Sequence, residues 1–233
     1  MTITELAEVG STNDWLLERP ESTDESWVRA DIQTGGRGRR GRAWVSQPGN
    51  LFTSVLVKPQ PGEGPQQQLS FVAAIALDRA LSRWVTPGRL ALKWPNDLLL
   101  DGLKVSGILL EAQGPATIIG FGVNLIEHPA DSERPAISLF AAGVAAPDAS
   151  TLCGALATSF ATVRAEWRTY GFGGIRAAWL ARASGLGHQI EARLGRETLV
   201  GRFEDLADDG ALLLRLDDGT LRAVHAGEVF ARG

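Results

Sequence analysis

The pattern of apolar and polar positions divides the chain into a longer part with mixed elements and a short C-terminal part. Between Trp27 and Ile32 apolar and polar residues alternate, which predicts a strand with one solvent-facing side. Two apolar runs between Leu90 and Ala112 flank Asp101-Gly102, a strong hairpin signal. The other predicted strands are 51–57 and 117–125, and helical spacing predicts helices over about 70–85, over about 150–170, and in a shorter segment to about 183.

From Gly185 onward no helical spacing is found. Short apolar runs separated by Asp-Gly turns follow, at 188–194, 198–206, 211–216 and 221–230. Four or five such strands predict a small antiparallel barrel or sandwich. The helices and hairpins before it predict an α+β fold with a mixed sheet. We therefore predict two domains, residues 1–184 and 185–233.

Length and composition narrow the classes of protein. A chain of 233 residues with 44% hydrophobic and 21% charged residues is typical of a soluble globular protein. The single Cys153 excludes a disulfide framework, and only three histidines argue against a dedicated metal site. A net charge of −4 argues against a surface devoted to nucleic acid. Neither a long apolar run nor a signal peptide is evident, so we expect a cytoplasmic protein without a membrane partner.

The segment Gly36–Arg42 carries four arginines interleaved with glycines. Glycine lets the backbone wrap closely around a ligand, and guanidinium groups bind phosphate or carboxylate oxygens. This composition predicts a flexible anion clamp. The spacing also matches a dinucleotide fingerprint, which we reject because Ala43–Asn50 predicts a turn and not the required helix. A merely solvated loop, or one that touches RNA nonspecifically, is the alternative.

Two further segments carry candidate chemistry. In Lys93-Trp94-Pro95-Asn96-Asp97, Pro95 interrupts strand pairing, so Asn96 and Asp97 are expected at a strand end. Lys104 precedes an apolar run on the return strand, and a positioned lysine can neutralise charge on a transferring phosphoryl group. The structural alternative is that Lys93 and Lys104 protect edge strands and Asp97 opens a turn.

Ser11-Thr12-Asn13 precedes an apolar run and predicts a helix N-cap at Ser11 or Thr12. A capped helix start also exposes hydroxyl and amide groups at the positive end of the helix. We therefore expect this segment to be able to bind a polar group.

In combination these segments closely resemble the biotin protein ligase family. The resemblance rests on motifs in the family's order and spacing, which cover most of residues 9–125: Ser11–Asn13, Gln33 with Gly36–Arg42 and Trp44, Lys93–Asp97, Lys104–Ile108 and Gly120–Asn124. It implies an α+β, mixed-sheet catalytic domain of the biotin/lipoate ligase type. The C-terminal stretch resembles, more weakly, the family's small SH3-like β-barrel.

The resemblance implies a reaction in two steps that uses ATP and Mg²⁺. The biotin carboxylate attacks the α-phosphate of ATP to give biotinyl-5′-adenylate and pyrophosphate. A lysine of a biotin carboxyl carrier protein, part of a biotin-dependent carboxylase, then attacks the mixed anhydride. Cationic side chains are needed because the first step brings two anions together.

The resemblance also assigns roles residue by residue. Lys104 is expected to be the main catalytic residue, with Arg39 beside it, while Lys93 and Asp97 face the carrier lysine. The biotin and adenylate site is expected to comprise Ser11, Thr12, Asn13, Gln33, Arg37, Gly38, Arg39 and Lys104, and the nucleotide site Arg40, Arg42, Trp44 and Asn124. No dedicated protein site for a metal is expected.

Two alternatives stay open at this point. A lipoate or octanoate ligase or transferase shares the fold, but an aliphatic chain offers little to Ser11–Asn13 and Gln33. A nonenzymatic RNA-binding module would combine the basic loop with the C-terminal strands, which contain few aromatic residues and several aspartates. The chain begins too close to Ser11 for an N-terminal helix-turn-helix domain, so no specific DNA binding is expected, whereas a homodimer is allowed.

Overall fold

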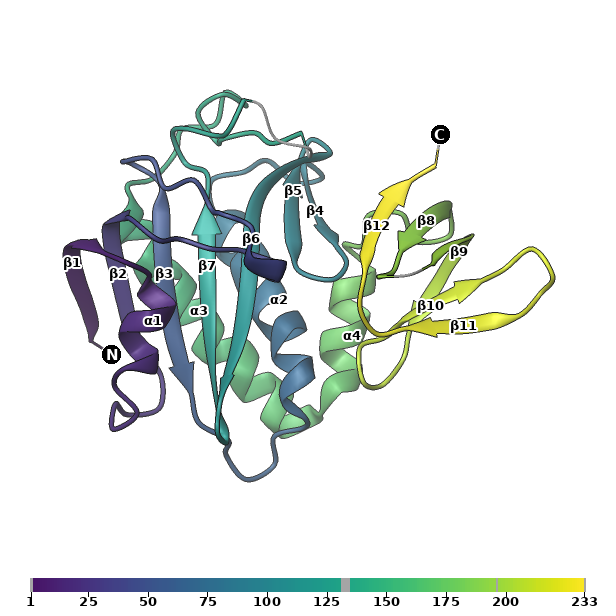
Figure 1. Cartoon of the computed structure of the whole chain (residues 1–233), viewed down its shortest axis with the longest axis horizontal. Coiled ribbons are helices and arrows are strands. Elements are labelled where there is room, and N and C mark those ends of the chain that lie inside the picture. The colour runs from purple at the N-terminus through teal and green to yellow at the C-terminus, as the bar shows by residue number, and fades with distance from the viewer. Residues whose placement is uncertain (1, 131–134, 196, 233) are drawn as a thin grey trace.

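The structure is a computed structural model that describes residues 2–130, 135–195 and 197–232. A seven-stranded sheet with strand order β1-β2-β3-β7-β6-β5-β4 forms its larger layer (Figure 1). The strands are β1 (Ile3–Val9), β2 (Ser26–Gln33), β3 (Leu51–Val57), β4 (Leu90–Lys93), β5 (Asp97–Leu100), β6 (Leu103–Gln113) and β7 (Ala116–Val123). All neighbours pair antiparallel except β1 and β2, which are parallel. The expected mixed sheet is thus confirmed.

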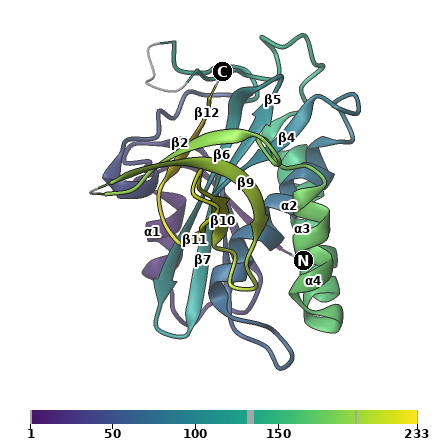
Figure 2. The ribbon, with the colours of Figure 1, turned by 90° about the vertical axis from the view of Figure 1, so that its right-hand side faces the viewer.

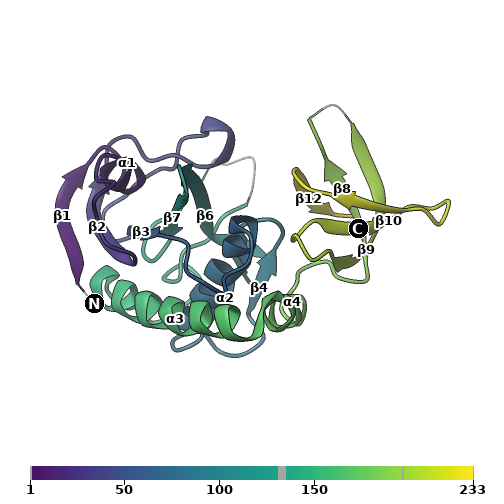
Figure 3. The same cartoon turned by 90° about the horizontal axis from the view of Figure 1, so that it is seen from below.

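Helices cover the two faces of this sheet unequally. One face carries α2 (Leu69–Leu81), α3 (Ala149–Tyr170) and α4 (Phe172–Leu180), whereas the other carries the short α1 (Thr12–Leu17) (Figure 3). Two 3₁₀ turns, η1 (Arg39–Gly41) and η2 (Gln66–Gln68), lie in the connections. The regularly spaced apolar residues of α3, among them Leu156 and Phe160, are fully buried, as the pattern predicts. The face with α1 is left open for a site.

The predicted hairpin is confirmed, but the apolar stretch before it is divided. Asp101 and Gly102 form the turn between β5 and β6, both with positive φ, 52° and 80°. The stretch 90–100 forms β4 and β5, joined by a turn at residues 94–96, where Pro95 was predicted to interrupt strand pairing. Pro95 lacks the N–H that a continuous strand would need at this position. Residues 93–97 therefore bend back at the end of the sheet.

The C-terminal strands form a second, antiparallel sheet in the order β11-β10-β9-β8-β12. Its strands are β8 (Gln189–Arg193), β9 (Thr198–Leu206), β10 (Leu212–Arg215), β11 (Leu221–Val224) and β12 (Glu228–Ala231). The SH3-like character is confirmed, the sheet is not closed as a barrel, and the run 221–230 holds two strands. β11 and β12 have four residues each, and each pairs on one side only, so the sheet keeps two open edges. Figure 2 views this sheet in front of the larger one.

The two sheets are joined by one continuous apolar core. Trp179 of α4 packs against Phe71 and Phe203, with ring centroids 5.5 and 6.3 Å away. The indole Nε1 of Trp94 donates to the carbonyl of Gly210 at 3.1 Å. The predicted domain boundary at residues 184 and 185 falls between α4 and β8 and stays a prediction. Within the described ranges, no helix has the length and apolarity to cross a membrane.

Candidate active site

A cavity of about 530 Å³ lies on the face of the large sheet that carries α1. The start of α1, the arginine–glycine loop and the adjoining ends of β6 and β7 surround it. It is lined by most of the residues that the sequence singles out: Ser11, Thr12, Asn13, Gln33, Arg37, Gly38, Arg39, Arg42, Trp44, Asp97, Lys104 and Asn124. Arg40 and Lys93 are not part of this lining. Segments more than 100 residues apart in sequence therefore meet at one site.

One end of the cavity is rich in hydrogen-bonding groups. Ser11 is the N-cap of α1 and accepts a bond from the amide of Asp14 at 3.4 Å, which confirms the predicted cap. The backbone N–H and hydroxyl of Thr12 donate to Oε1 of Gln33, at 2.8 and 3.0 Å. These contacts fix the Gln33 amide at the cavity wall. The end is suited to a neutral polar group with both donors and acceptors.

Glycines in β6 and β7 form the floor. A Cβ at Gly122 would lie 2.5 Å from Trp44 Cε2, and one at Gly107 would lie 3.2 Å from the Lys104 ammonium. A Cβ at Gly120 would collide with the side-chain oxygen of Asn13. These three positions are glycines, and the absence of a Cβ atom makes room for the side chains of Trp44, Lys104 and Asn13.

The other end is cationic. The Lys104 ammonium lies 2.6 Å from Oδ1 of Asp97 and 5.5 Å from the centre of the Trp44 ring. The Asp97 side chain is 5% exposed and that of Lys104 is 20% exposed. Both residues line the cavity, and the ammonium is the more accessible member of the ion pair. Arg39 reaches across to Asn96 and donates to its Oδ1 at 3.3 Å. This end is suited to an anion.

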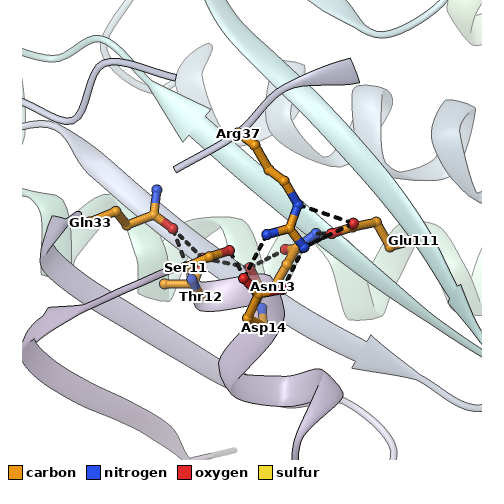
Figure 4. A network of polar contacts seen from close by, with 8 residues as sticks. Ser11, Thr12, Asn13, Asp14, Gln33, Arg37 and Glu111 are labelled. Atoms are coloured by element: carbon orange, nitrogen blue, oxygen red, sulfur yellow. Dashed lines mark hydrogen bonds and ion pairs between the residues drawn. The ribbon is translucent and has the colours of Figure 1, made fainter. Parts of the chain in front are cut away.

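Arg37 and Arg42 of the loop are held by carboxylates. Arg37 donates to both oxygens of Asp14, at 2.6 and 2.5 Å, and to Glu111 at 3.0 Å (Figure 4). This ion pair lowers the pKa of Asp14, mainly through the Arg37 hydrogen bonds, and the same bonds raise the pKa of Arg37. Arg42 pairs with Glu228 of β12. The loop is thus tied both to the large sheet and to the small one.

Lys93 lies outside the cavity lining and near the small sheet. Its ammonium lies 5.2 Å from the ring centre of Phe230, and Arg193 lies on the same ring at 4.3 Å. The aromatic ring is therefore covered by two cations. Lys93 contributes to the contact between the two sheets.

Sequence reasoning missed three polar residues of the site: Asp14, Ser54 and Glu111. Ser54 is fully buried beneath Thr12 and Asn13, and its hydroxyl donates to Asn13 Oδ1 at 2.5 Å. Glu111 contacts Asn13 across 98 positions of sequence. Contacts between residues so far apart in sequence leave no local pattern. The one signal for Glu111 was that it is the single acidic residue in the largely apolar strand β6.

Comparison with known proteins agrees with this geometry. Residues 6–124 match the family model described as "Biotin/lipoate A/B protein ligase family", and residues 185–232 match "Biotin protein ligase C terminal domain". The chain is 44% identical to a biotin–[acetyl-CoA-carboxylase] ligase of Paracoccus denitrificans, over 98% of this chain and 100% of that protein. The chain belongs to the biotin/lipoate protein ligase family. This confirms the resemblance on which the residue assignments rest.

Other members of the family extend the comparison. A biotin–[acetyl-CoA-carboxylase] ligase of Mycobacterium tuberculosis is 33% identical, over 96% of this chain and 86% of that protein. The biotin protein ligase of Aquifex aeolicus, solved with biotin and ATP, has a TM-score of 0.86 and 28% identity, covering 99% of this chain and 98% of its own. The Leishmania major ligase, solved with biotinyl-5-AMP, has a TM-score of 0.71 and 26% identity, covering 97% of this chain and 99% of its own. The family likeness thus extends over both sheets.

Proposed function

We propose that this chain is an ATP-dependent biotin protein ligase. It would activate biotin as biotinyl-5′-adenylate and transfer it to a lysine of a biotin carboxyl carrier domain, that of acetyl-CoA carboxylase. One observation carries the proposal: a single cavity has a neutral hydrogen-bonding end at Thr12 and Gln33 and a cationic end at Lys104. Biotin has a ureido ring at one end and a carboxylate at the other, so each end of the cavity matches one end of biotin.

In the first step, a carboxylate oxygen of biotin attacks the α-phosphorus of ATP. The bond from that phosphorus to the bridging oxygen of pyrophosphate breaks, and pyrophosphate leaves with its electron pair. The Lys104 ammonium, oriented by Asp97 at 2.6 Å, would offset the negative charge that accumulates between the two anions. Arg39 would assist from the loop. Trp44 and Asn124 would lie against the nucleotide, with Arg40 and Arg42 at its phosphates.

Mg²⁺ is proposed to enter with the nucleotide. Among the described residues, no group of three or more His, Cys, Asp or Glu side chains is placed to ligate a metal. Mg²⁺ keeps several waters and is commonly held through substrate phosphates with at most one or two carboxylates. The residues present fit that mode, in which the ion would neutralise phosphate charge.

In the second step, the amine of the carrier lysine attacks the acyl carbon of the anhydride. AMP leaves, and the nitrogen loses a proton as the amide forms. Asp97 lines the cavity whereas Lys93 lies under Phe230, so we propose that Asp97 faces the incoming amine. The carrier lysine would enter at the end where Arg39 and Asn96 meet.

The two alternative functions fit less well. An octanoyl or lipoyl chain would place an apolar surface against the buried Thr12 and the half-buried Gln33, which is costly. RNA binding by the C-terminal sheet would need exposed aromatic platforms on its strands, but Phe203 is buried and Phe230 is covered by Lys93 and Arg193. A homodimer, a cytoplasmic location and the lack of specific DNA binding stay predictions.

Transfer to a carrier domain tests the proposed function. The protein would be incubated with ATP, Mg²⁺, biotin and the carrier domain of acetyl-CoA carboxylase, and the carrier would be weighed by mass spectrometry. We expect the mass of one biotinyl group on the parent carrier and none on a carrier whose target lysine is changed to arginine. Equal labelling of both carriers, or modification with lipoate but not with biotin, would contradict the proposal.

A further inference from the structure

Glu111 of β6 contacts the cavity floor and the arginine–glycine loop at the same time. Its Oε2 accepts a bond from Nδ2 of Asn13 at 2.6 Å, and its Oε1 accepts one from Arg37 at 3.0 Å (Figure 4). The side chain is 26% exposed, so both bonds are partly shielded from water. One carboxylate thus joins two parts of the site that are distant in sequence.

The Arg37 guanidinium is nearly saturated by two carboxylates. Its Nε and one terminal nitrogen donate to Glu111, and both terminal nitrogens donate to Asp14. Of the five N–H groups of a guanidinium, four are used in these contacts. Two acids on one arginine also leave no surplus positive charge. Arg37 is therefore built to hold the base of the loop and not to bind a substrate anion.

Glu111 also sets the orientation of the Asn13 amide. A carboxylate accepts hydrogen bonds and donates none, so the amide nitrogen of Asn13 must face Glu111. The amide oxygen then faces the hydroxyl of Ser54, at 2.5 Å, and lies directly over Gly120. Asn13 is fixed from three sides, and with it the polar end of the cavity.

We infer that Glu111 and Asp14 are positioning residues, which anchor the base of the arginine–glycine loop through Arg37 and thereby retain the adenylate in the cavity. Glu111 has a second role through Asn13, in the pocket for the ureido ring. The inference rests on the proposed function, because it names what the anchored loop retains. An anchored loop of this kind is expected to change the affinity for the adenylate and its rate of release more than the rate of the chemical step.

Two conservative variants separate the roles. In Asp14→Asn only the loop anchor is weakened, so we expect biotinyl-adenylate to leave about tenfold faster, the usual scale for one lost charge-assisted bond, with the KM for biotin within twofold of the parent. In Glu111→Gln we expect faster release and also a KM for biotin raised about tenfold. Glu166→Gln is the matched control, since Glu166 makes a bidentate pair with Arg79 between α2 and α3, away from the cavity.

A second readout needs no ligand. Trypsin must take the arginine side chain into its own pocket, so cleavage after Arg37 requires this guanidinium to leave its carboxylates. The initial rate of cleavage after Arg37, relative to that after the exposed Arg40, should rise about tenfold in Asp14→Asn and Glu111→Gln and stay unchanged in Glu166→Gln. Mass spectrometry identifies each cut.

The outcomes are distinct. Cleavage after Arg37 at the parent's relative rate in both variants would overturn the anchor. Faster cleavage with unchanged adenylate release would overturn the positioning role. A parent that forms no biotinyl-adenylate at all would overturn the proposed function and the retention role, while the trypsin ratio would still decide whether the anchor exists.

Discussion

Lys104 is the residue on which the proposed chemistry depends most directly. Its ammonium is held by the buried Asp97 and lies on the Trp44 ring at the cavity wall. We expect Lys104→Ala to lower the rate of adenylate formation by about 10²-fold, as losses of charge contacts made in the transition state do. Lys58→Ala, outside the cavity lining, is the control. A loss below about threefold, measured by pyrophosphate release, would remove Lys104 from its role.

Gly122 keeps the place of Trp44 open. Because a Cβ here would lie 2.5 Å from the indole, Gly122→Ala must displace the ring. We expect the KM for ATP to rise about tenfold, the scale of one lost aromatic–base stack. Gly154→Ala, where nothing lies within 4 Å of the added Cβ, should leave it unchanged. An unaltered KM for ATP in Gly122→Ala would show that Trp44 does not stack on the nucleotide.

At the scale of single residues, the sequence predicts site residues where characteristic residue types cluster. It does not predict contacts between residues that are distant along the chain. The Arg/Gly density and the Lys-Trp-Pro-Asn-Asp block single out most of the cavity lining in advance. The Arg37 ion pairs escape prediction because Asp14 and Glu111 come from elements 23 and 74 positions away. Only the folded chain shows that Arg37 is neutralised by two carboxylates.

Among the elements, α3 is linked by one buried arginine to the connecting segments that precede β2 and follow β3. The Arg164 side chain is 3% exposed, donates to Asp24 at 2.9 Å and to Glu63 at 2.6 Å, and reaches the carbonyl of Lys58 at 2.7 Å. Arg164→Ala leaves buried acids without their cation, so we expect a loss of about 3–5 kcal/mol in the free energy of unfolding. Exposed Arg168→Ala is the control in the same urea titrations. Losses of equal size in both would contradict this assignment.

Elements with a clean period could be predicted and irregular ones could not. β3 was predicted with its bounds, and all seven of its residues are buried, as expected for a central strand. β1 escaped prediction because its half-buried positions, Ile3, Leu6 and Val9, recur every third residue and not every second. β1 lies at the edge of the sheet and pairs with β2, so an alternation of apolar and polar residues is not required in it.

For the whole molecule, ion pairs predict sensitivity to acid. Arginine partners lower the pKa of several carboxyls from their ordinary values of 3.8 and 4.5: Asp14, Asp101, Glu166 and Glu204. The pKa of Glu5 is lowered first by the Ser150 hydroxyl and then by Arg29. A lowered folded-state pKa stabilises the protein above the unfolded-state pKa, and this contribution is lost as pH falls through the folded-state value.

We therefore expect the urea midpoint to be insensitive to these groups between pH 7 and about 5.5 and to fall below about pH 4, near the ordinary carboxyl values. Added salt should weaken the acid dependence, since most of these pairs are solvent-exposed. A midpoint that rises on acidification would contradict the sign of the effect.

The arrangement of the two sheets could not be read from the sequence. Turn signals marked the C-terminal strands, yet neither the open edges of that sheet nor its contact with the loop through Arg42 and Glu228 has a local signature. The packing of Trp179 on Phe203 depends on where α4 ends relative to β9. Such tertiary geometry is set by the shape of the shared core.

Biotin-dependent release of pyrophosphate from ATP and Mg²⁺, without any carrier, tests the central claim most directly. Lipoate and octanoate would be assayed in parallel on the same folded sample. The account predicts release with biotin and none above background with the other two acids, because only biotin has a polar ring for Thr12 and Gln33. Release with lipoate or octanoate but not with biotin, or with none of the three, would contradict it.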